Sequence, residues 1–143
     1  MGTIETALSI AVDAHRGQRD KAGKPYILHP LRLMHKCATD AEMIVAVLHD
    51  VMEDTEVTAG NLEREGFGQD VIQALQCLTK VKGESYPDFI KRVSANGLAR
   101  KVKMLDLADN MDCSRLSTFT DADAARMKRY TEAMAYLRSD TSE

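Results

Sequence analysis

The sequence predicts an all-α protein, a single-domain bundle of about seven to eight helices around one core. Apolar residues recur at helical spacing in most segments, and no segment shows the alternation that is typical of a half-buried strand. The 143 residues include only eight Gly and three Pro, so few positions interrupt a helix. A chain of this length suits one domain, and we expect residues 1–143 to form it without internal repeats or linkers.

The first two helices are expected on either side of a polar loop. Thr3 is a capping residue for the first helix, whose inward positions continue at helical spacing to His15. The stretch 17–25 is polar and contains glycine, so we expect a loop there. Pro30 suits the first position of a second helix over 30–37, because proline lacks the N–H that has no helical partner at that position.

The third helix is expected to be the centre of the fold. Asp40 is predicted to cap it, and residues 41–53 are apolar on nearly every side, as in a helix that other helices surround. Thr58 is predicted to cap a short helix that stops before Gly66. Apolar spacing and helix-breaking residues place the remaining helices at 69–78, 86–93, 98–111 and 120–137.

Charge and cysteine content argue against several classes of protein. The net charge is −3 and the one basic run, at 126–129, is too short for a nucleic-acid binder. The three cysteines are far apart and odd in number, which argues against a disulfide framework and a thiolate zinc site. We find neither a signal peptide nor an apolar run that could span a bilayer, so we expect a cytoplasmic protein with no membrane partner. A homodimer is left open.

The pair His49-Asp50 carries most of the chemical information, because it lies among apolar residues on the central helix. Burying an unpaired carboxylate is costly. Imidazole and carboxylate are common ligands of divalent metals, and a metal ion would remove that cost. Glu53 and Asp54, called the acidic pair below, follow at i+4 and belong to the same end of the helix.

Two further helices offer matching groups. His29 stands at the start of the second helix, and Asp106 lies between two leucines in a later one. If the three helices converge, four side chains, called the His–Asp cluster below, meet at a single divalent ion: His29, His49, Asp50 and Asp106. Such an ion lowers the pKa of bound water, and the acidic pair would position that water or move protons.

Each of these residues also has an ordinary structural explanation. A histidine before a proline is common in loops, an aspartate in a helix is often solvated, and acidic residues often end a helix. His15 is expected to be a structural hydrogen-bonding residue and His35 a surface residue. The metal hypothesis therefore depends on the complete set, in order and with its flanking residues.

Longer strings resemble the hydrolase domain of the RelA/SpoT family, within the HD superfamily of metal-dependent phosphohydrolases. The resemblance covers about residues 5–137. The matching strings are AHRGQ at 14–18, Lys21, Gly23, PYILHP at 25–30, HDVMEDT at 49–55 for the motif HDxxED, LTK at 78–80 and KMLDLADN at 103–110 for the motif KLADRLHN.

The resemblance implies a stand-alone small alarmone hydrolase built as an HD domain. Such proteins remove the 3′-pyrophosphate of ppGpp and pppGpp, releasing pyrophosphate and GDP or GTP, usually with one Mn²⁺ ion. The resemblance implies that the His–Asp cluster binds the metal and that Glu53 and Asp54 are catalytic. It also implies four contacts to the nucleotide substrate, made by Lys21, Asn110, Arg126 and Tyr130.

The sequence departs from the family pattern beside the expected nucleotide site. Asp20 stands where long RelA/SpoT enzymes have an arginine that packs on guanine, and Met111-Asp112-Cys113 stands where the family often has Met-Arg-Thr. Both changes leave the hydrolytic residues intact and leave the base specificity open. One alternative is hydrolysis of another phosphorylated nucleotide, such as an adenine alarmone or the 2′-phosphate of NADPH. A second is a non-catalytic, nucleotide-binding helical module.

Overall fold

The computed structural model describes residues 2–139 and confirms an all-α fold, because this range contains no strand beyond an isolated bridge between Arg19 and Pro25. None of its helices is both long enough and apolar enough to cross a membrane. The elements of the described range are, in order, α1 (Ile4–Ala14), α2 (Leu28–His35), α3 (Asp40–Leu48), α4 (Val51–Asp54), α5 (Ala59–Arg64), α6 (Gln69–Cys77), α7 (Tyr86–Ser94), α8 (Gly97–Asn110), the 3-10 turn η1 (Cys113–Arg115) and α9 (Asp121–Ser139).

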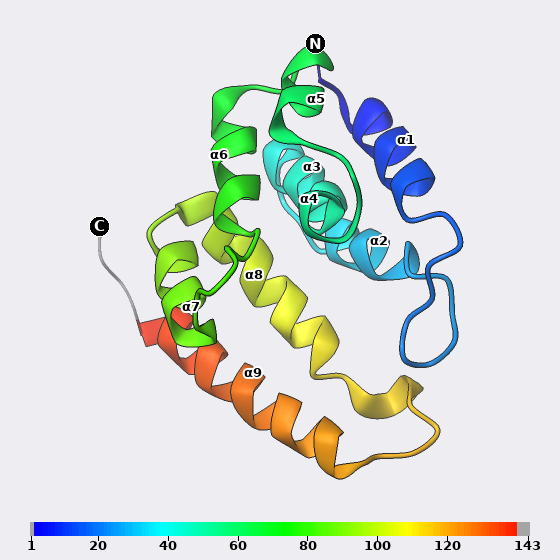
Figure 1. Cartoon of the computed structure of the whole chain (residues 1–143), viewed down its shortest axis with the longest axis vertical. Helices are drawn as coiled ribbons and strands as arrows, with labels where there is room; N and C mark the ends of the chain where they lie inside the picture. The colour runs from blue at the N-terminus through cyan, green and yellow to red at the C-terminus, as the bar shows by residue number, and fades with distance from the viewer. Residues whose placement is uncertain (1, 140–143) are drawn as a thin grey trace.

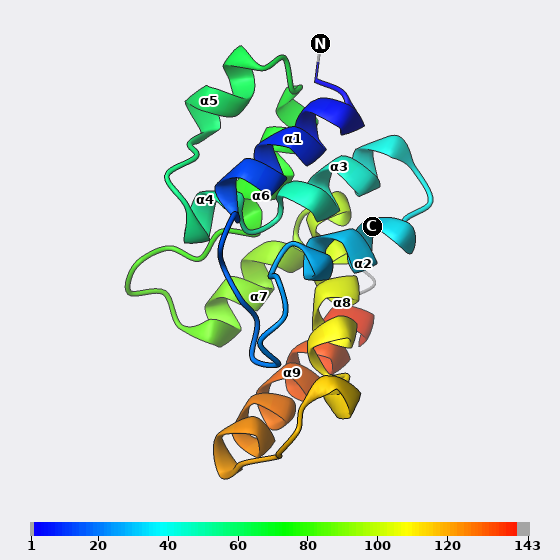
Figure 2. The ribbon, with the colours of Figure 1, turned by 90° about the vertical axis from the view of Figure 1, so that its right-hand side faces the viewer.

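The centre of the fold is α3, as the sequence predicts. This helix packs against α1, α2, α6 and α8, and its residues Val45, Val47 and Leu48 are fully buried. Figure 1 shows α8 running obliquely from this upper body to η1 and α9. In the view of Figure 2, the first half of α9 projects below the rest of the molecule. Contacts of α9 with α7 and α8 anchor it to the body.

The prediction of one continuous helix over 41–53 is wrong at the His49-Asp50 pair. Helix α3 ends at Leu48, and the one-turn helix α4 begins at Val51. His49 Nδ1 lies 2.7 Å from the carbonyl oxygen of Ala46. In a continuous helix, that oxygen would instead accept the backbone N–H of Asp50. Asp50 has φ −110° and ψ −1°, outside regular helix. The break divides one predicted helix into α3 and α4, so the described range has one α-helix more than the expected seven to eight.

Side-chain caps define most helix starts. Thr3 and Thr58 cap α1 and α5 as predicted. The prediction of Asp40 as the cap of the third helix is wrong by one residue, because Thr39 Oγ1 accepts the backbone N–H of Glu42 and Asp40 begins the helix. Helix α2 begins two residues before Pro30, since the three preceding positions already form a turn in which Leu28 donates to the carbonyl of Pro25.

We expect Leu75→Ala to test the packing of α6 against α3. Leu75 is fully buried, so its truncation should lower the free energy of unfolding by about 2–5 kcal/mol. The matched control Gln73→Ala, on the exposed face of the same helix, should change it by less than about 0.5 kcal/mol. Denaturant titration followed by circular dichroism measures both, and equal losses would contradict the packing.

Candidate active site

The four side chains of the predicted His–Asp cluster meet where α2, α3 and α8 contact one another. One ligand atom from each of His29, His49 and Asp50 lies within 4.8 Å of the other two. Asp106 Oδ1 lies 2.8 Å from His29 Nε2 and 3.4 Å from His49 Nε2. Residues separated by more than 70 positions in the sequence therefore share one buried place.

The residues present fit a metal site. His29 Nδ1 lies 2.6 Å from Asp109 Oδ2 and His49 Nδ1 lies 2.7 Å from the Ala46 carbonyl oxygen, so each neutral ring carries its proton on Nδ1 and turns the Nε2 lone pair inward. His49 Nε2 is buried without a hydrogen-bond partner among the described residues, since the two cluster aspartates lie 3.1 and 3.4 Å away without hydrogen-bonding geometry. Inward imidazole nitrogens beside carboxylate oxygens suit a divalent transition metal.

Burial and opposite charge act against each other in the cluster. Burial disfavours the imidazolium of His29, but hydrogen bonds to two aspartates outweigh it and raise the His29 pKa. Burial likewise opposes the charge on His49, yet Asp50 and Asp106 hold its pKa well above the ordinary value. Burial alone would raise the pKa of Asp106, but the charge of Lys103 and the two imidazoles hold it well below its usual range. A divalent cation could replace the imidazole protons, whose positive charge balances the carboxylates of the cluster.

Three neighbouring side chains hold the cluster carboxylates in place. Tyr26 donates its hydroxyl proton to Asp50 Oδ2. Lys103 Nζ donates to Asp106 Oδ2 at 2.8 Å, and Asn110 Nδ2 donates to Asp106 Oδ1 at 3.1 Å. Both oxygens of Asp106 are therefore held, Oδ2 by an ammonium group and Oδ1 by an amide and the imidazole of His29.

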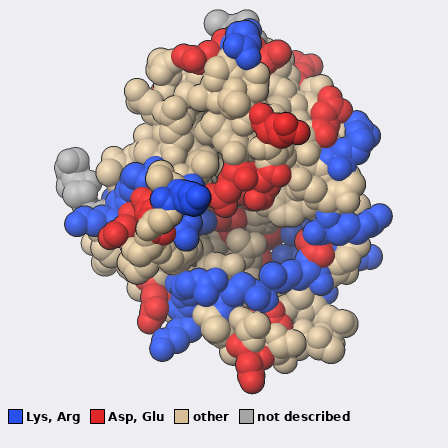
Figure 3. Space-filling view, viewed as in Figure 1, with Lys and Arg blue, Asp and Glu red and all other residues tan. Residues whose placement is uncertain are grey.

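The acidic pair lies on α4, directly after the cluster, and both side chains are exposed. The backbone N–H of Lys80 donates to Glu53 Oε1 at 2.8 Å. Although Asp54 is exposed, its carboxyl loses part of its hydration, and this loss, with the charges of Asp50 and Glu53, raises the pKa of Asp54. Asp54 is therefore a better proton acceptor near neutral pH than an ordinary aspartate. Figure 3 shows acidic side chains in the hollowed middle of this face, above a band of Lys and Arg that lies over α9.

A pocket of about 270 Å³ adjoins the cluster between the loop 15–27, the end of α8 and the first half of α9. His29 lies on its wall, so the pocket opens directly beside the cluster. Arg19, Arg32 and Arg115 also line it and supply positive charge that suits a phosphorylated ligand. The wall includes the four residues predicted to contact substrate, Lys21, Asn110, Arg126 and Tyr130.

The residues that depart from the family pattern have structural roles in this wall. Asp20 lines the pocket, and its Oδ1 accepts the backbone N–H groups of Ala22 and Lys24, each at 2.9 Å. Such a side-chain turn fixes the shape of the loop. Cys113 Sγ lies 3.7 Å from Met127 Sδ, and Met127 in turn lines the pocket. Position 20 therefore faces the ligand space, whereas Cys113 reaches it through a neighbour.

Comparison with protein families decides the class of this chain. Residues 7–132 match the HD domain, which is most of the sequence. The chain belongs to the HD-domain family. The membership that the His49-Asp50 string and its neighbours imply is confirmed, and divalent-metal dependence is the expected property of HD phosphohydrolases.

Named relatives of this HD domain are much longer proteins. It is 35% identical over 118 residues to guanosine-3′,5′-bis(diphosphate) 3′-pyrophosphohydrolase of Aquifex aeolicus, covering 76% of this chain and 17% of the relative. The protein of the same name from Vibrio cholerae is 34% identical over 112 residues, covering 70% and 16%. The bifunctional (p)ppGpp synthase/hydrolase SpoT of Escherichia coli is 31% identical over 118 residues, covering 74% and 17%. The chain thus spans about one sixth of the length of these relatives.

A solved structure shares the fold over nearly the whole HD domain. It is a metazoan ortholog of SpoT that hydrolyses ppGpp and plays a role in starvation responses. The two structures superimpose with a TM-score of 0.80 at 22% identity, covering 99% of this chain and 88% of that one. At this identity the likeness concerns the fold.

The sequence predictions missed three residues that form hydrogen bonds to the cluster side chains. Lys103 and Asp109 stand three positions before and after Asp106 on α8, and this spacing places all three on one helix face. That spacing is a signal that could have found them. Tyr26 offers no such signal, because its partner Asp50 is 24 positions away. The predictions for His15 and His35 agree with the structure, in which His15 is buried against Gln18 and His35 is exposed.

We expect the stability of the metal-free protein to fall as the pH rises. Because folding raises the pKa of His29 and His49, their contribution is complete below the ordinary value of about 6.5 and is lost as the pH passes the folded pKa. Added divalent metal should restore more stability at higher pH, since metal and protons compete for the same nitrogens.

Melting temperatures of EDTA-treated and metal-loaded protein between roughly pH 5.5 and 8.5 test this expectation. His35→Gln, a change on an exposed imidazole outside the cluster, should keep the wild-type profile. A melting temperature of the metal-free protein that rises steadily over this range would contradict it.

Proposed function

We propose that this HD domain is a metal-dependent phosphohydrolase that removes the 3′-pyrophosphate of ppGpp and pppGpp, releasing pyrophosphate and GDP or GTP. The observation that carries the proposal is the buried His–Asp cluster, with the unpartnered His49 Nε2, beside a positively charged pocket whose wall includes His29. Relatives named for this reaction support the choice of substrate. The pocket has the charge that a nucleotide with several phosphates requires.

The His–Asp cluster would hold one divalent ion, which we propose to be Mn²⁺. When bound, such an ion stabilises negative charge on the reacting phosphate and lowers the pKa of water. Tyr26 and Lys103 each hold one of the two cluster carboxylates by a hydrogen bond. The protein therefore fixes the ligand directions before any substrate arrives.

Asp54 is proposed to accept the proton of the attacking water, because its raised pKa suits a base near neutral pH. The water oxygen forms a bond to the phosphorus on the ribose 3′ oxygen, and the bond from that phosphorus to the 3′ oxygen breaks. Glu53, fixed by the backbone N–H of Lys80, is proposed to take up a proton from solvent and pass it to the departing 3′ oxygen, which restores the Glu53 carboxylate. The proton on Asp54 then returns to solvent.

The pocket wall supports a division of roles in substrate binding. Lys21 and Arg126 supply charge for phosphate groups from opposite elements, the loop before α2 and helix α9. Tyr130 follows Arg126 at i+4 on the same helix face, so its ring and the guanidinium group can meet one ligand. Asn110 contacts Asp106 and lines the pocket, which suits a contact to the sugar or the reacting phosphate.

A second candidate, the hydrolysis of another phosphorylated nucleotide, is motivated by Asp20, which stands where long RelA/SpoT enzymes have an arginine that packs on guanine. Its carboxylate lines the pocket, where a carboxylate oxygen can accept a hydrogen bond from an amino group of a base. Guanine and adenine both carry such a group, so this contact does not separate them. Turnover measured across ppGpp, an adenosine 3′-pyrophosphate and NADPH separates the candidates, and preference for an adenine compound would replace the first proposal with the second.

We expect loss of a metal ligand to abolish hydrolysis. With Mn²⁺, the wild-type protein should convert ppGpp to GDP and pyrophosphate, whereas His49→Ala and Asp50→Ala should give only the background of an enzyme-free sample. The same variants should bind no Mn²⁺ by metal analysis, and His35→Ala should behave as wild type. Hydrolysis by Asp50→Ala after metal removal would reject the proposal.

The variant Asp54→Asn tests the proposed base. Its kcat should fall by about 10²–10⁴-fold while its Mn²⁺ affinity stays near the wild-type value, because the amide keeps the size of the side chain and cannot accept the proton. Glu56→Gln removes a nearby exposed charge and is the control. A kcat of Asp54→Asn within a small factor of wild type would assign the base elsewhere.

A further inference from the structure

Asp109 is a buried carboxylate that has no part in the proposed chemistry. It lies in the last turn of α8, and its side chain is 4% exposed. A buried carboxylate is stable only when it is paired. Three cationic or protonated groups surround this one, from His29, Arg32 and Arg115.

The carboxylate joins His29 to Arg32. Asp109 Oδ2 lies 2.6 Å from His29 Nδ1 and accepts Arg32 Nη2 at 2.9 Å, while Asp109 Oδ1 accepts Arg32 Nε at 2.9 Å. Two bonds from one planar guanidinium group fix the plane of a carboxylate. Asp109 Oδ2 is therefore held at the place where the His29 ring needs an acceptor.

The two imidazoles of the cluster differ in what orients them. The Nδ1 acceptor of His49 is the Ala46 carbonyl oxygen, which belongs to the backbone of α3. The Nδ1 acceptor of His29 is a side chain, so its orientation depends on residue identity at position 109. Such partners of a metal-binding histidine fix its tautomer and ring direction, and their loss lowers metal affinity by about 10–100-fold.

The same carboxylate also faces the nucleotide pocket. Arg115 Nη2 donates to the Asp109 carbonyl oxygen at 3.1 Å and lies 3.5 Å from Asp109 Oδ2. Arg32 and Arg115 both line the pocket, with side chains that are 30% and 32% exposed. Both side chains are thus partly open toward the pocket while Asp109 contacts their guanidinium groups.

We propose that Asp109 is a positioning residue for the proposed reaction, holding the ring of His29 toward the metal and the guanidinium groups of Arg32 and Arg115 toward the nucleotide. One carboxylate thereby orients residues in both halves of the site, the metal half formed by the His–Asp cluster and the nucleotide half formed by the pocket. The proposal rests on the proposed function for the nucleotide half, whereas the metal half can be measured without any nucleotide.

The decisive measurement is the Mn²⁺ affinity of nucleotide-free protein, by calorimetry, in wild type and Asp109→Asn. The amide offers one acceptor oxygen where His29 and both nitrogens of Arg32 compete for two, so we expect a loss of about 10–100-fold. The hydrogen-bonded Nδ1 proton of His29 should also shift in the NMR spectrum of the metal-free variant. A merely structural role would lower the melting temperature and leave both readouts unchanged.

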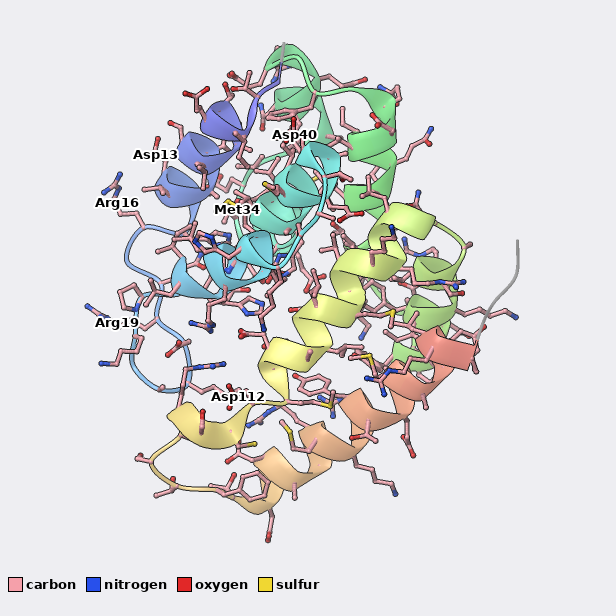
Figure 4. The ribbon with its side chains drawn as sticks, turned by 180° about the vertical axis from the view of Figure 1, so that it is seen from behind. Asp13, Arg16, Arg19, Met34, Asp40 and Asp112 are labelled. Carbon is pink, nitrogen blue, oxygen red and sulfur yellow. The ribbon has the colours of Figure 1, made fainter. Side chains whose placement is uncertain are left out.

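Two aspartates provide matched controls. Asp112 lies just beyond the end of α8 and shares Arg115 with Asp109, and Asp13 pairs with Arg16 on the outer side of α1 (Figure 4). Asp112→Asn and Asp13→Asn should keep the wild-type Mn²⁺ affinity, because neither side chain contacts His29. An equal loss in Asp112→Asn would overturn the specific role of Asp109.

A second variant serves if Asp109→Asn fails to fold. Arg32→Lys keeps the charge of a partly exposed side chain but cannot form both hydrogen bonds to the carboxylate. We expect Mn²⁺ affinity to fall by about 10-fold or less and GDP affinity to fall with it. Wild-type Mn²⁺ affinity in either Asp109→Asn or Arg32→Lys would overturn the proposal.

The outcomes separate this proposal from the proposed function. Weaker Mn²⁺ binding in Asp109→Asn supports the positioning role even if no variant, wild type included, hydrolyses ppGpp. Hydrolysis by the wild type combined with unchanged Mn²⁺ affinity in Asp109→Asn would uphold the function and reject the positioning role.

Discussion

The meeting of two imidazoles with two carboxylates inside the bundle constrains the rest of this structure. Four polar side chains at one buried place require opposite charges in contact, because unpaired groups there would oppose folding. Helices α2, α3 and α8 must therefore cross closely enough to bring the side chains together, and their mutual contacts show that they do. The apolar residues of α3 on the other sides of the helix hold it in this position.

The site combines a part on packed helices with a part on surface segments. The His–Asp cluster stands on helices in the centre of the bundle, where packing fixes side-chain direction. The pocket beside it is built largely from the loop 15–27, η1 and the projecting half of α9. The metal-binding residues are thus placed in the core and the residues proposed for recognition on surface segments, with Tyr26 and Arg115 connecting the two through Asp50 and Asp109.

The sequence allowed the fold class and the cluster to be predicted, for different reasons. Helical spacing of apolar residues determines the fold class, and it needs no long-range information. His29 and Asp106 are 77 positions apart, so their meeting follows from their place in strings that resemble a known family and not from spacing.

The remaining details depend on competition that local patterns cannot resolve. At the break after Leu48, the His49 side chain occupies the carbonyl oxygen of Ala46. The spacing of apolar residues carries no information about such a hydrogen bond. Thr39 and Asp40 are adjacent and both residue types favour the capping position. Helix α3 begins at Asp40 because Thr39 makes the capping hydrogen bond. The partners of Asp109 lie on another helix, so only the packed structure identifies them.

The contact between Lys80 and Glu53 has an evolutionary consequence. The donor is a main-chain N–H, which every residue except proline possesses. Position 80 can therefore change its side chain freely without releasing the glutamate, and only a change in the course of the backbone after α6 would do so. Changes in the charge of this surface loop therefore leave the orientation of Glu53, the proposed proton donor, unaffected.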